Sequence, residues 1–415
     1  MEAMRLATNI VTTLVREGYI AYFAGGWVRD YLMGHPSDDI DIATDAPPEK
    51  IVALFPRTLL VGLAFGVVIV LVDGHQFEVA TFRRDIDYTD GRKPTRIELS
   101  SPEEDASRRD FTINGMFYDP IEGVVHDYVH GAEDLKHQII RAIGNPDERF
   151  VEDRLRMIRA VRFSARFGFV IDQDTETAIV ANADTLFPAV AMERVWQEIC
   201  KMAKYPRFDH ALIEMHRLGL LQVIFPQLQG VHLNEIKHQV AAFHIFPKDV
   251  EPILYLLQLF PKASVRASVD LCLYLRTSNL NAQLAEFYVS MRNCVESEHL
   301  LNVVDLCAWA HFYAHPHAEK CLQVLAASMA ANERSVFLTK HRERAEKLKK
   351  HSQRIINKIP LVNASVLQAE GVVPGRLMGL LIKEGEQIAI LHDFETVADV
   401  LKVLKTTHLW PKHDT

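Results

Sequence analysis

The sequence predicts a chain of the α+β class, with a mixed-sheet N-terminal part followed by a long, all-helical part. Short apolar and β-branched runs, such as Tyr19–Ala24 and Phe65–Val72, alternate with helical patterns as far as about residue 145. From there to the end, apolar residues recur at three- and four-residue spacing, as at Ile253, Leu256 and Leu257. We therefore expect a sheet near the N-terminus and helices beyond it.

Local signals predict the main elements in order. Residues 3–18 have a helical apolar pattern, and Asp73-Gly74 predicts a tight hairpin that returns along Gln76–Arg83. The polar stretch Asp85–Ser101 predicts a mobile loop. Residues Val151–Gly168 predict one helix, which the terminal glycine ends.

Length and composition limit the type of protein. A chain of 415 residues is long enough for several domains, and we expect four parts: 1–145, 146–205, 206–330 and 331–415. A net charge of −8 argues against nucleic-acid binding by the whole surface, but permits a local basic track. The five cysteines are far apart, and no apolar stretch approaches ~18 residues. We expect a cytoplasmic protein with no membrane partner. The sequence does not determine the oligomeric state.

The most informative motif is the glycine–arginine run Gly25–Asp30, which is followed by Asp39 and Asp41. Residues two apart in an extended segment point to the same side, so the two later aspartates can project together. Two convergent carboxylates can hold Mg²⁺, with the phosphates of a substrate completing its coordination shell. The paired glycines let the backbone approach a triphosphate closely. Taken alone, the pattern fits an acidic hairpin turn equally well.

Two further groups of polar residues extend this hypothesis. Glu78 lies on the predicted returning strand and could point toward Asp39 and Asp41. The run Arg108–Asn114 begins with two arginines, which are suited to bidentate contact with phosphate. A helix start with a charged first turn, capped by Ser107, is an alternative explanation of the same run.

The run Glu152–Phe163 carries one acid and three arginines at three-residue steps on one predicted helix, at Asp153, Arg156, Arg159 and Arg162. An ion pair between the first two would make this an ordinary salt-bridged amphipathic helix. The arginines of the run outnumber its nearby acids, however, which predicts uncompensated positive charge suited to a triphosphate and a nucleobase. An acceptor beside a guanidinium can also match the hydrogen-bonding edge of a base.

Residues 331–360 form a second basic region, with nine basic and three acidic residues. We give equal weight to two interpretations of this predicted helix. Its charges either form a solvated helix face or follow the phosphate backbone of a nucleic acid.

These motifs resemble those of the class II tRNA nucleotidyltransferases, the family of CCA-adding enzymes and their bacterial poly(A) polymerase relatives. Five motifs occur in the family's order over about residues 20–200. They are G-G-x-V-R-D with D-x-D-x-x-T at Gly25–Asp30 and Asp39–Thr44, R-R-D-F-T-x-N at Arg108–Asn114, D-x-x-x-G-x-x-D-L at Asp127–Leu135, E-D-x-x-R-x-x-R-A-x-R-F at Glu152–Phe163, and R-V-x-x-E at Arg194–Glu198. The match at Gly371–Gly379 is looser, because Arg376 stands where a proline is usual.

The resemblance implies a fold and an activity. Residues 1–145 would form a polymerase-β-like nucleotidyltransferase head, 146–205 a nucleotide-selecting neck, 206–330 a helical body and 331–415 a tRNA-binding tail. The implied reaction is template-independent addition of CCA to the 3′ end of tRNA. It would use CTP and ATP, depend on Mg²⁺ and release pyrophosphate.

The resemblance also implies roles for individual residues. Asp39 and Asp41 would be catalytic and bind Mg²⁺, with Glu78 as a supporting carboxylate. Asp153 and Arg156 would pair with C or A as an amino-acid template. The full nucleotide-binding set expected is Gly25, Gly26, Arg29, Arg109, Asp110, Asn114, Asp153, Arg156, Arg159 and Arg162.

Close alternatives share these motifs. A poly(A) polymerase would have all five, and a partial enzyme could add only CC or only A. The D-G-R-x-P pattern at Asp90–Pro94 lies in a loop that CC-only relatives typically lack, which favours a full CCA enzyme. The absence of a long basic extension argues weakly against a poly(A) polymerase. Intact Asp39 and Asp41 argue against an RNA-binding protein without activity.

Overall fold

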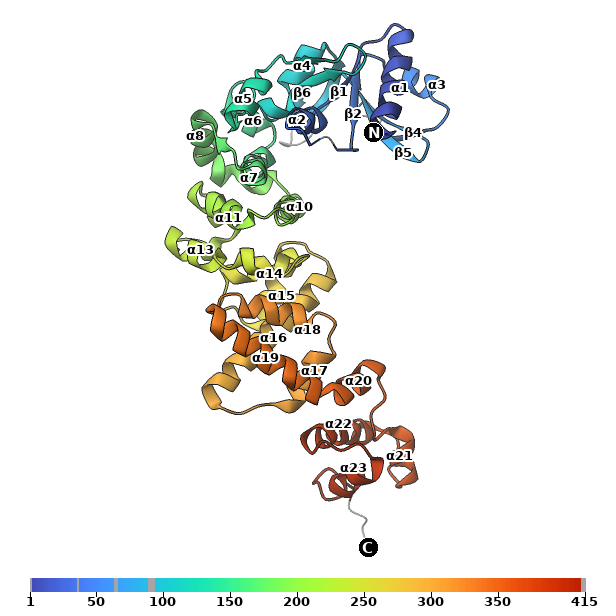
Figure 1. The fold of residues 1–415 in the computed structure, drawn as a ribbon, viewed down its shortest axis with the longest axis vertical. Coiled ribbons are helices and arrows are strands. Elements are labelled where there is room, and N and C mark those ends of the chain that lie inside the picture. Colours follow the sequence, from blue (N-terminus) through green and yellow to red (C-terminus); the bar gives the residue numbers. More distant parts are fainter. Residues whose placement is uncertain (1, 36, 63–65, 89–93, 412–415) are drawn as a thin grey trace. The chain divides into compact units, whose positions relative to one another are not determined.

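The computed structural model describes residues 2–35, 37–62, 66–88 and 94–411, in two compact units, 1–238 and 239–415. The first unit holds the mixed sheet and several helices, and the second is helical (Figure 1). The expected α+β class is therefore confirmed. Phe65 and Asp90, both used in the predictions above, lie outside the described residues. The expected boundaries at residues 145, 205 and 330 remain a prediction.

Among the described residues, the main sheet has seven strands in the order β3-β4-β5-β2-β1-β8-β9. Their bounds are β1 (Ala21–Ala24), β2 (Asp41–Thr44), β3 (Thr58–Gly62), β4 (Val67–Val72), β5 (His75–Thr81), β8 (Phe117–Asp119) and β9 (Val124–His126). Strands β2 and β5 are parallel, with Ile42 beside Val79, and the other neighbours are antiparallel. A short parallel pair, β10 (Ile139–Ile140) and β11 (Val170–Ile171), lies apart from this sheet.

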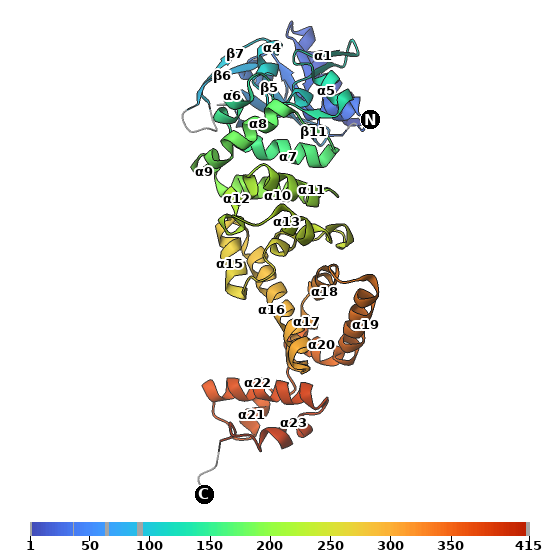
Figure 2. The ribbon, with the colours of Figure 1, turned by 90° about the vertical axis from the view of Figure 1, so that its left-hand side faces the viewer.

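The helices before the second unit are α1 (Glu2–Arg16), α2 (Gly26–Leu32), α3 (Pro48–Leu54), α4 (Pro102–Ser107), α5 (Gly131–His137), α6 (Pro146–Glu152), α7 (Leu155–Phe167), α8 (Gln173–Asn182), α9 (Leu186–Ala189), α10 (Met192–Met202), α11 (Phe208–Arg217) and α12 (Leu220–Ile224). Helices α10 and α11 both pack against α7, which lies next to the sheet-containing part (Figure 2). Helix α7 therefore connects the helices α10 and α11 to the part of this unit that contains the strands.

The remaining helices are α13 (Leu233–Val240), α14 (Pro252–Leu256), α15 (Val265–Tyr274), α16 (Asn279–Leu301), α17 (Leu306–Ala314), α18 (Ala318–Ala326), α19 (Ala331–Lys347), α20 (Lys349–Asn357), α21 (Ala364–Ala369), α22 (Arg376–Leu391) and α23 (Val397–Leu404). Helices α21 to α23 share a core of their own, which includes Leu367, Leu381 and Val400. None of the helices in the described ranges is long and apolar enough to cross a membrane.

Alternation along the strands gives the main sheet two buried faces. Phe23 and Ile42 belong to the core that α1 covers, whereas Ala24 and Ala43 belong to a separate core. Successive side chains of a strand point to opposite faces, so Asp41 shares the face of Ala43. This alternation places Asp41 on the side of the sheet away from α1.

The predicted hairpin at Asp73-Gly74 is confirmed. Strands β4 and β5 pair in register up to Val72 and His75. Asp73 and Gly74 have φ angles of 47° and 79°. Two successive positive φ angles are what a two-residue turn of type I′ requires.

The loop predicted over Asp85–Ser101 is wrong for most of its length. Strands β6 (Arg83–Tyr88) and β7 (Pro94–Leu99) pair as an antiparallel hairpin there, and residues 89–93 lie outside the described residues. The prediction gave weight to polarity and to the Gly and Pro residues. Apolar and polar residues alternate with a period of two up to Ile86 and Tyr88. This alternation is a strand pattern, and the prediction overlooked it.

The single helix predicted over Val151–Gly168 is interrupted. Asp153 lies between α6 and α7 in an extended conformation, with φ −149° and ψ 101°. Its carboxylate accepts a hydrogen bond from the backbone N–H of Leu155, at 3.1 Å, and so caps the start of α7. Gly168 ends α7 with a φ of 74°, as predicted.

The turn before α5 explains the glycine of the D-x-x-x-G-x-x-D-L motif. Asp127 accepts hydrogen bonds from the backbone N–H groups of this turn, including that of Gly131 at 2.9 Å. Asp134 accepts one from the hydroxyl of Thr112, at 2.8 Å. A Cβ atom on Gly131 would lie 2.2 Å from the carbonyl oxygen of Thr112. The motif therefore packs α5 directly against residues 112–114.

We predict that Gly131→Ala lowers the free energy of unfolding by about 2–3 kcal/mol, because the added methyl group has to displace backbone. Urea unfolding of the full chain measures this effect. Ala132→Gly, at the exposed neighbouring position, removes a methyl group instead of adding one. It should lower the free energy of unfolding by about 1 kcal/mol or less. Equal losses in the two variants would contradict the tight packing at Gly131.

Candidate functional site

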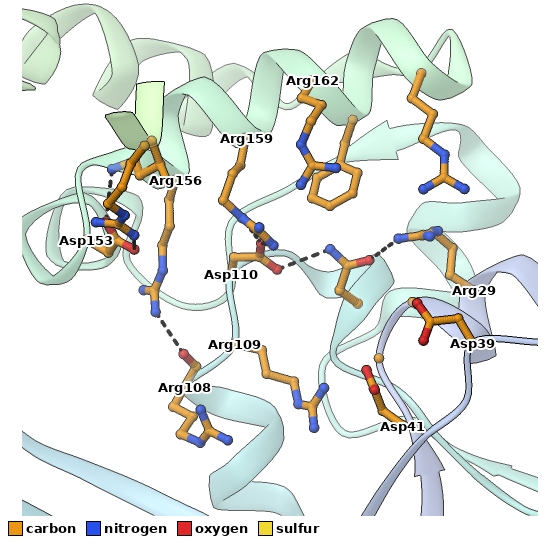
Figure 3. Close-up of a pocket in the computed structure, with 17 residues that line it drawn as sticks. Arg29, Asp39, Asp41, Arg108, Arg109, Asp110, Asp153, Arg156, Arg159 and Arg162 are labelled. Atoms are coloured by element: carbon orange, nitrogen blue, oxygen red, sulfur yellow. Dashed lines mark hydrogen bonds and ion pairs between the residues drawn. The ribbon is translucent and has the colours of Figure 1, made fainter. Parts of the chain in front are cut away.

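A cavity of about 510 Å³ lies where the turn after β1, the start of β2, residues 108–114 and helix α7 meet (Figure 3). Its lining contains eight arginines and four aspartates. The lining residues are Gly25, Gly26, Arg29, Asp39, Asp41, Arg108, Arg109, Asp110, Asn114, Asp153, Leu155, Arg156, Arg159, Arg162, Phe163, Arg166 and Arg194. Apart from Glu78, every residue predicted for the site lines this cavity.

Asp39 and Asp41 lie at one end of the cavity, on the side where Arg29 is drawn (Figure 3). The antiparallel register pairs Asp41 with Ala24, so the glycine turn after β1 begins beside this aspartate. Gly25 has a φ of 67°, and a Cβ atom there would lie 3.1 Å from a guanidinium nitrogen of Arg109. Glycine therefore lets the backbone turn sharply between the carboxylates and the arginine.

Glu78 lies beside this end of the cavity, on the neighbouring parallel strand. Because Ile42 pairs with Val79, the preceding residues Asp41 and Glu78 are also neighbours across the sheet. Desolvation raises the pKa of Asp41 to about 6, and the negative charges of Glu78 and Asp39 add to this, while Arg109 opposes it. Glu78 and Asp39 thus repel the charge of Asp41, and a cation near Asp41 would relieve this repulsion.

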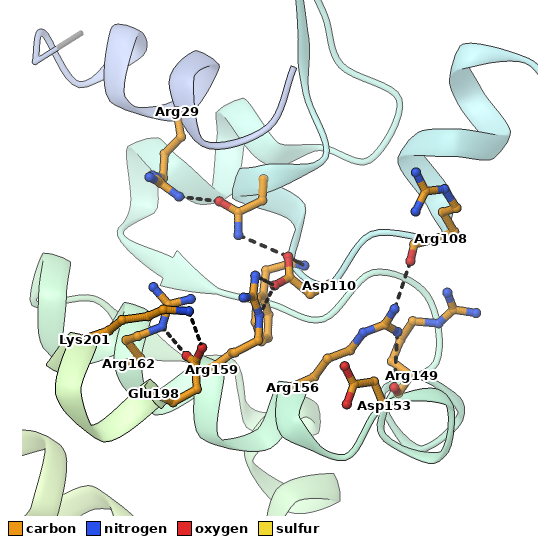
Figure 4. Close-up of polar contacts among 12 residues, drawn as sticks. Arg29, Arg108, Asp110, Arg149, Asp153, Arg156, Arg159, Arg162, Glu198 and Lys201 are labelled. Carbon is orange, nitrogen blue, oxygen red and sulfur yellow. Dashed lines mark hydrogen bonds and ion pairs between the residues drawn. The ribbon is translucent and has the colours of Figure 1, made fainter. Parts of the chain in front are cut away.

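A chain of hydrogen bonds crosses the middle of the cavity. Arg29 donates to the side-chain oxygen of Asn114, and Asn114 donates to Asp110 at 3.1 Å. Asp110 also accepts two bonds from Arg159, at 2.8 and 2.5 Å. This chain links α2, residues 110–114 and α7 (Figure 4).

Asp110 is the buried anion of this chain. Desolvation alone would raise its pKa, but the charge and hydrogen bonds of Arg159, with the amide of Asn114, outweigh desolvation and lower the pKa to about 2. The same pair raises the pKa of Arg159, against the desolvation of its guanidinium. Asp110 therefore stays ionised and keeps Arg159 in place at neutral pH.

Asp153 and Arg156 lie together at the opposite end of the cavity from Asp41 (Figure 3). They do not form the ion pair that the alternative of a salt-bridged helix assumed, because Asp153 precedes α7 and pairs with Arg194 at 2.8 Å. Arg156 pairs with Glu152 at 2.6 Å and donates to the carbonyl oxygen of Arg108 at 3.1 Å. Both side chains are thus held in fixed orientations by separate partners.

The positive charge predicted for the run Glu152–Phe163 is compensated, which corrects that expectation. Each arginine predicted for the site on α7 has a carboxylate within 2.6 Å: Arg156 has Glu152, Arg159 has Asp110 and Arg162 has Glu198. Glu198 also accepts a bond from Lys201 (Figure 4). Two of these acids lie 36 and 49 residues away in the sequence, so the composition of the run did not reveal them.

Five lining residues were not assigned to the site from the sequence: Arg108, Leu155, Phe163, Arg166 and Arg194. Arg166 follows Arg162 by four residues on α7, so helical periodicity could have found it. Phe163 lies under several guanidinium groups, and that of Arg162 is 4.1 Å from its ring centroid. A phenylalanine inside a charged motif is a signal of this kind of stacking.

The basic region 331–360 corresponds to α19, α20 and the residues beside them. Four of its nine basic residues have acidic partners: Lys340 and Arg344 share Glu298, Lys349 pairs with Glu346, and Lys350 pairs with Asp393 and Glu395. Within the described part of the chain, no acidic partner is found for Arg342, Lys347 or Lys358. Much of the charge of this region is therefore used in ion pairs of the second unit.

Comparison with known proteins gives consistent results. Residues 21–141 match the family model of the poly A polymerase head domain, and residues 168–230 match that of the probable RNA and SrmB-binding site of polymerase A. The chain is 44% identical over 215 residues to the CCA-adding enzyme of Geobacillus thermodenitrificans, covering 52% of this chain and 53% of that protein. It is 42% identical over 242 residues to that of Geobacillus stearothermophilus, covering 58% of each.

In both family models and in these relatives, the chain is similar to the CCA-adding enzymes and poly(A) polymerases. The two sequence alignments span little more than half the length of these curated relatives. The fold likeness extends further. The CCA-adding enzyme of Bacillus stearothermophilus in complex with CTP has a TM-score of 0.77 and 28% identity, and 98% of each chain is covered. The Thermotoga maritima CCA-adding enzyme complexed with tRNA has a TM-score of 0.68 at 18% identity, covering 96% of this chain and 95% of that one, and supports the fold alone.

We predict that Asp110 makes part of the stability of the folded chain pH-dependent. Its pKa is lower in the folded chain than the ordinary value of 3.8, so its stabilisation is complete above about pH 4 and is lost as the pH falls toward 2. The lost contribution is about 2 kcal/mol. Asp110→Asn should therefore be less stable than wild type from pH 7 to 5, with a gap that narrows below pH 4.

Urea unfolding at several pH values measures this gap. Asp184→Asn, at an exposed aspartate of the same unit, is the matched control and should show almost no gap. A gap that stays constant down to pH 3 would mean that Asp110 is not the ionised partner of Arg159.

Proposed function

We propose that this chain adds C, C and A, in that order, to the 3′ end of tRNA. The substrates are CTP and ATP, the products include pyrophosphate, and no nucleic-acid template is used. The observation that carries the proposal is that one cavity holds Asp39 and Asp41 at one end and Asp153 and Arg156 at the other (Figure 3). A nucleoside triphosphate has the same two ends, a phosphate chain and a base.

The carboxylate end fits Mg²⁺. Asp39 and Asp41 offer the oxygen ligands that Mg²⁺ prefers, and burial, together with the charges of Glu78 and Asp39, raises the pKa of Asp41. Among the described residues, no three or more His, Cys, Asp or Glu side chains are grouped so that they could hold a metal by themselves, so substrate oxygens would have to complete the shell. When bound, the ion supplies charge stabilisation for the transferred phosphoryl group and a more acidic RNA 3′-hydroxyl. Glu78 supports the pair from the neighbouring strand.

The arginines near the carboxylates suit the triphosphate and the sugar. Arg109 lies beside Gly25, and Arg29 lines the cavity next to Gly26. Asn114, hydrogen-bonded to both Arg29 and Asp110, fixes this group. Fixed guanidinium donors stabilise the phosphates without reorganising during the reaction. Arg159 and Arg162 would position phosphate or base between the two ends.

Asp153 and Arg156 would select the base. Arg194 orients Asp153, and the carbonyl oxygen of Arg108 orients Arg156. Side chains held by such secondary contacts present their remaining acceptor and donor positions in fixed directions. A carboxylate and a guanidinium presented in this way can pair with the edge of C or of A.

The helical part of the chain would bind the tRNA itself. Arg342, Lys347 and Lys358 are the candidates in the basic region for contact with its phosphates. We place the protein in the cytoplasm because its five cysteines are free thiols, which suits a reducing compartment.

A primer-extension experiment tests the proposed function. The full chain is incubated with Mg²⁺ and a tRNA that ends at the discriminator base, with CTP alone, ATP alone or both, and the 3′ ends are sequenced. We expect two C residues from CTP alone, and C, C, A followed by a stop from both nucleotides. Long A tails on unrelated RNA would identify a poly(A) polymerase, and addition of only CC or only A would identify a partial enzyme.

Two variants link the activity to the carboxylate end. Asp41→Ala should lower the rate by about 10²–10³-fold or more, because it removes a metal-binding carboxylate, while the affinity for tRNA is retained. Asp38→Asn, at an exposed acid next to Asp39 that does not line the cavity, is the matched control and should keep the wild-type rate. Equal rates for wild type and Asp41→Ala would contradict the proposed mechanism.

A further inference from the structure

Arg166 is an arginine of the cavity that none of the family motifs contains. It lies on the last turn of α7, lines the cavity and keeps 26% of its side chain exposed. Its guanidinium stacks on Phe167 at 4.7 Å and on Tyr205 at 5.2 Å from the ring centroids. Stacking covers the faces of a guanidinium and leaves its N–H edges available for an anion.

Arg166 shares both its carboxylate and one of its aromatic partners with Arg29. One oxygen of Asp30 accepts from Arg29 at 2.7 Å, and the other accepts from Arg166 at 3.2 Å. The guanidinium of Arg29 lies 4.6 Å from the same Phe167 ring. Two cations thus share one anion, so the group has a net positive charge.

The location of this group points to the phosphate end of the cavity. Arg29 lines the cavity together with Asp39 and Asp41, on the side where Figure 3 shows them, and the shared carboxylate of Asp30 holds Arg166 next to Arg29. Desolvation lowers the pKa of Arg29, and the charge of Arg166 lowers it further, against the charge of Asp30. A polyanion at this end would relieve the repulsion between the two guanidinium groups.

The hydrogen bonding of Arg166 in the described part of the chain leaves most of its N–H donors available for a ligand. A guanidinium has five N–H donors, and in the described part of the chain Arg166 uses one of them, toward Asp30. Arg159, by comparison, donates through two nitrogens to Asp110. Arg166 therefore combines a fixed position with several unused donors.

We propose that Arg166 is a further triphosphate-binding residue and that Phe167 is the positioning residue that holds it and Arg29 at the phosphate end. This inference rests on the proposed function, because it presumes that a nucleoside triphosphate occupies the cavity. The alternative is that Arg166 only joins α7 to α2 through Asp30, without contacting the substrate. A purely structural link would affect all nucleotides alike, whereas a contact to the β- or γ-phosphate, which CMP lacks, would weaken the triphosphates alone.

Binding of CTP, ATP and CMP to the full chain, without RNA, separates these possibilities. Calorimetry measures the two triphosphates, and competition against CTP measures CMP. We expect Arg166→Gln to weaken CTP and ATP by about tenfold each, with the affinity for CMP unchanged. Arg154→Gln is the matched control, because Arg154 lies at the other end of α7, bonds to Thr185 and does not line the cavity.

Phe167 is tested in the same way. Phe167→Leu should weaken the triphosphates and spare CMP, whereas Phe167→Tyr keeps a ring under the guanidinium groups and should restore the affinity. Phe169→Leu is the control, because Phe169 contacts Phe167 and no arginine stacks on it among the described residues. These variants keep apolar side chains at both positions.

Unchanged triphosphate affinity in Arg166→Gln, or an equal loss for CTP and CMP, would overturn the inference and leave the proposed function intact. Failure of the wild-type chain to bind CTP and ATP at all would overturn both.

Discussion

The ion pair between Asp110 and Arg159 is the interaction on which the rest of the site depends. It joins residues that are 49 positions apart, one beside the sheet and one on α7. Through Asn114 the same carboxylate orders Arg29, so one buried anion positions groups from three elements. Removal of one member of such a pair leaves a buried charge without its partner. This lowers the free energy of unfolding more than replacement of both members by apolar residues does.

Asp41, at one end of the cavity, and Asp110, in its middle, differ in their electrostatic environments, and this difference indicates how the cavity can work. Asp41 has a raised pKa because it is desolvated and lies near other carboxylates, whereas Asp110 has a lowered pKa because Arg159 is its partner. Arg109 opposes the shift at Asp41 without outweighing it, whereas Arg159 outweighs the desolvation of Asp110. A further cation would therefore stabilise the charge of Asp41, while Asp110 already has its partner in the wall of the cavity. Asp153, bound to Arg194, belongs to the same kind of fixed wall.

The sequence predicted those parts of the fold and site that depend on local spacing. The D-x-D spacing and the turn at Asp73-Gly74 determine backbone geometry within a few residues. Of the thirteen site residues predicted from the motifs, twelve line one cavity. The carboxylate partners of α7 were missed because Asp110 and Glu198 come from elsewhere in the chain. The break at Asp153 was missed because a side-chain cap competes with helix continuation, and periodicity does not report this competition.

In the proposed reaction, protein side chains rather than a nucleic-acid template choose the incoming nucleotide. The most direct measurement is the ratio of C to A incorporation by Arg156→Ala with both nucleotides present, together with its affinity for tRNA. Arg154→Ala serves as the control on the same stretch of chain. We expect Arg156→Ala to lose much of the choice between CTP and ATP while its tRNA affinity changes little. Wild-type selectivity in Arg156→Ala would mean that Arg156 does not select the base.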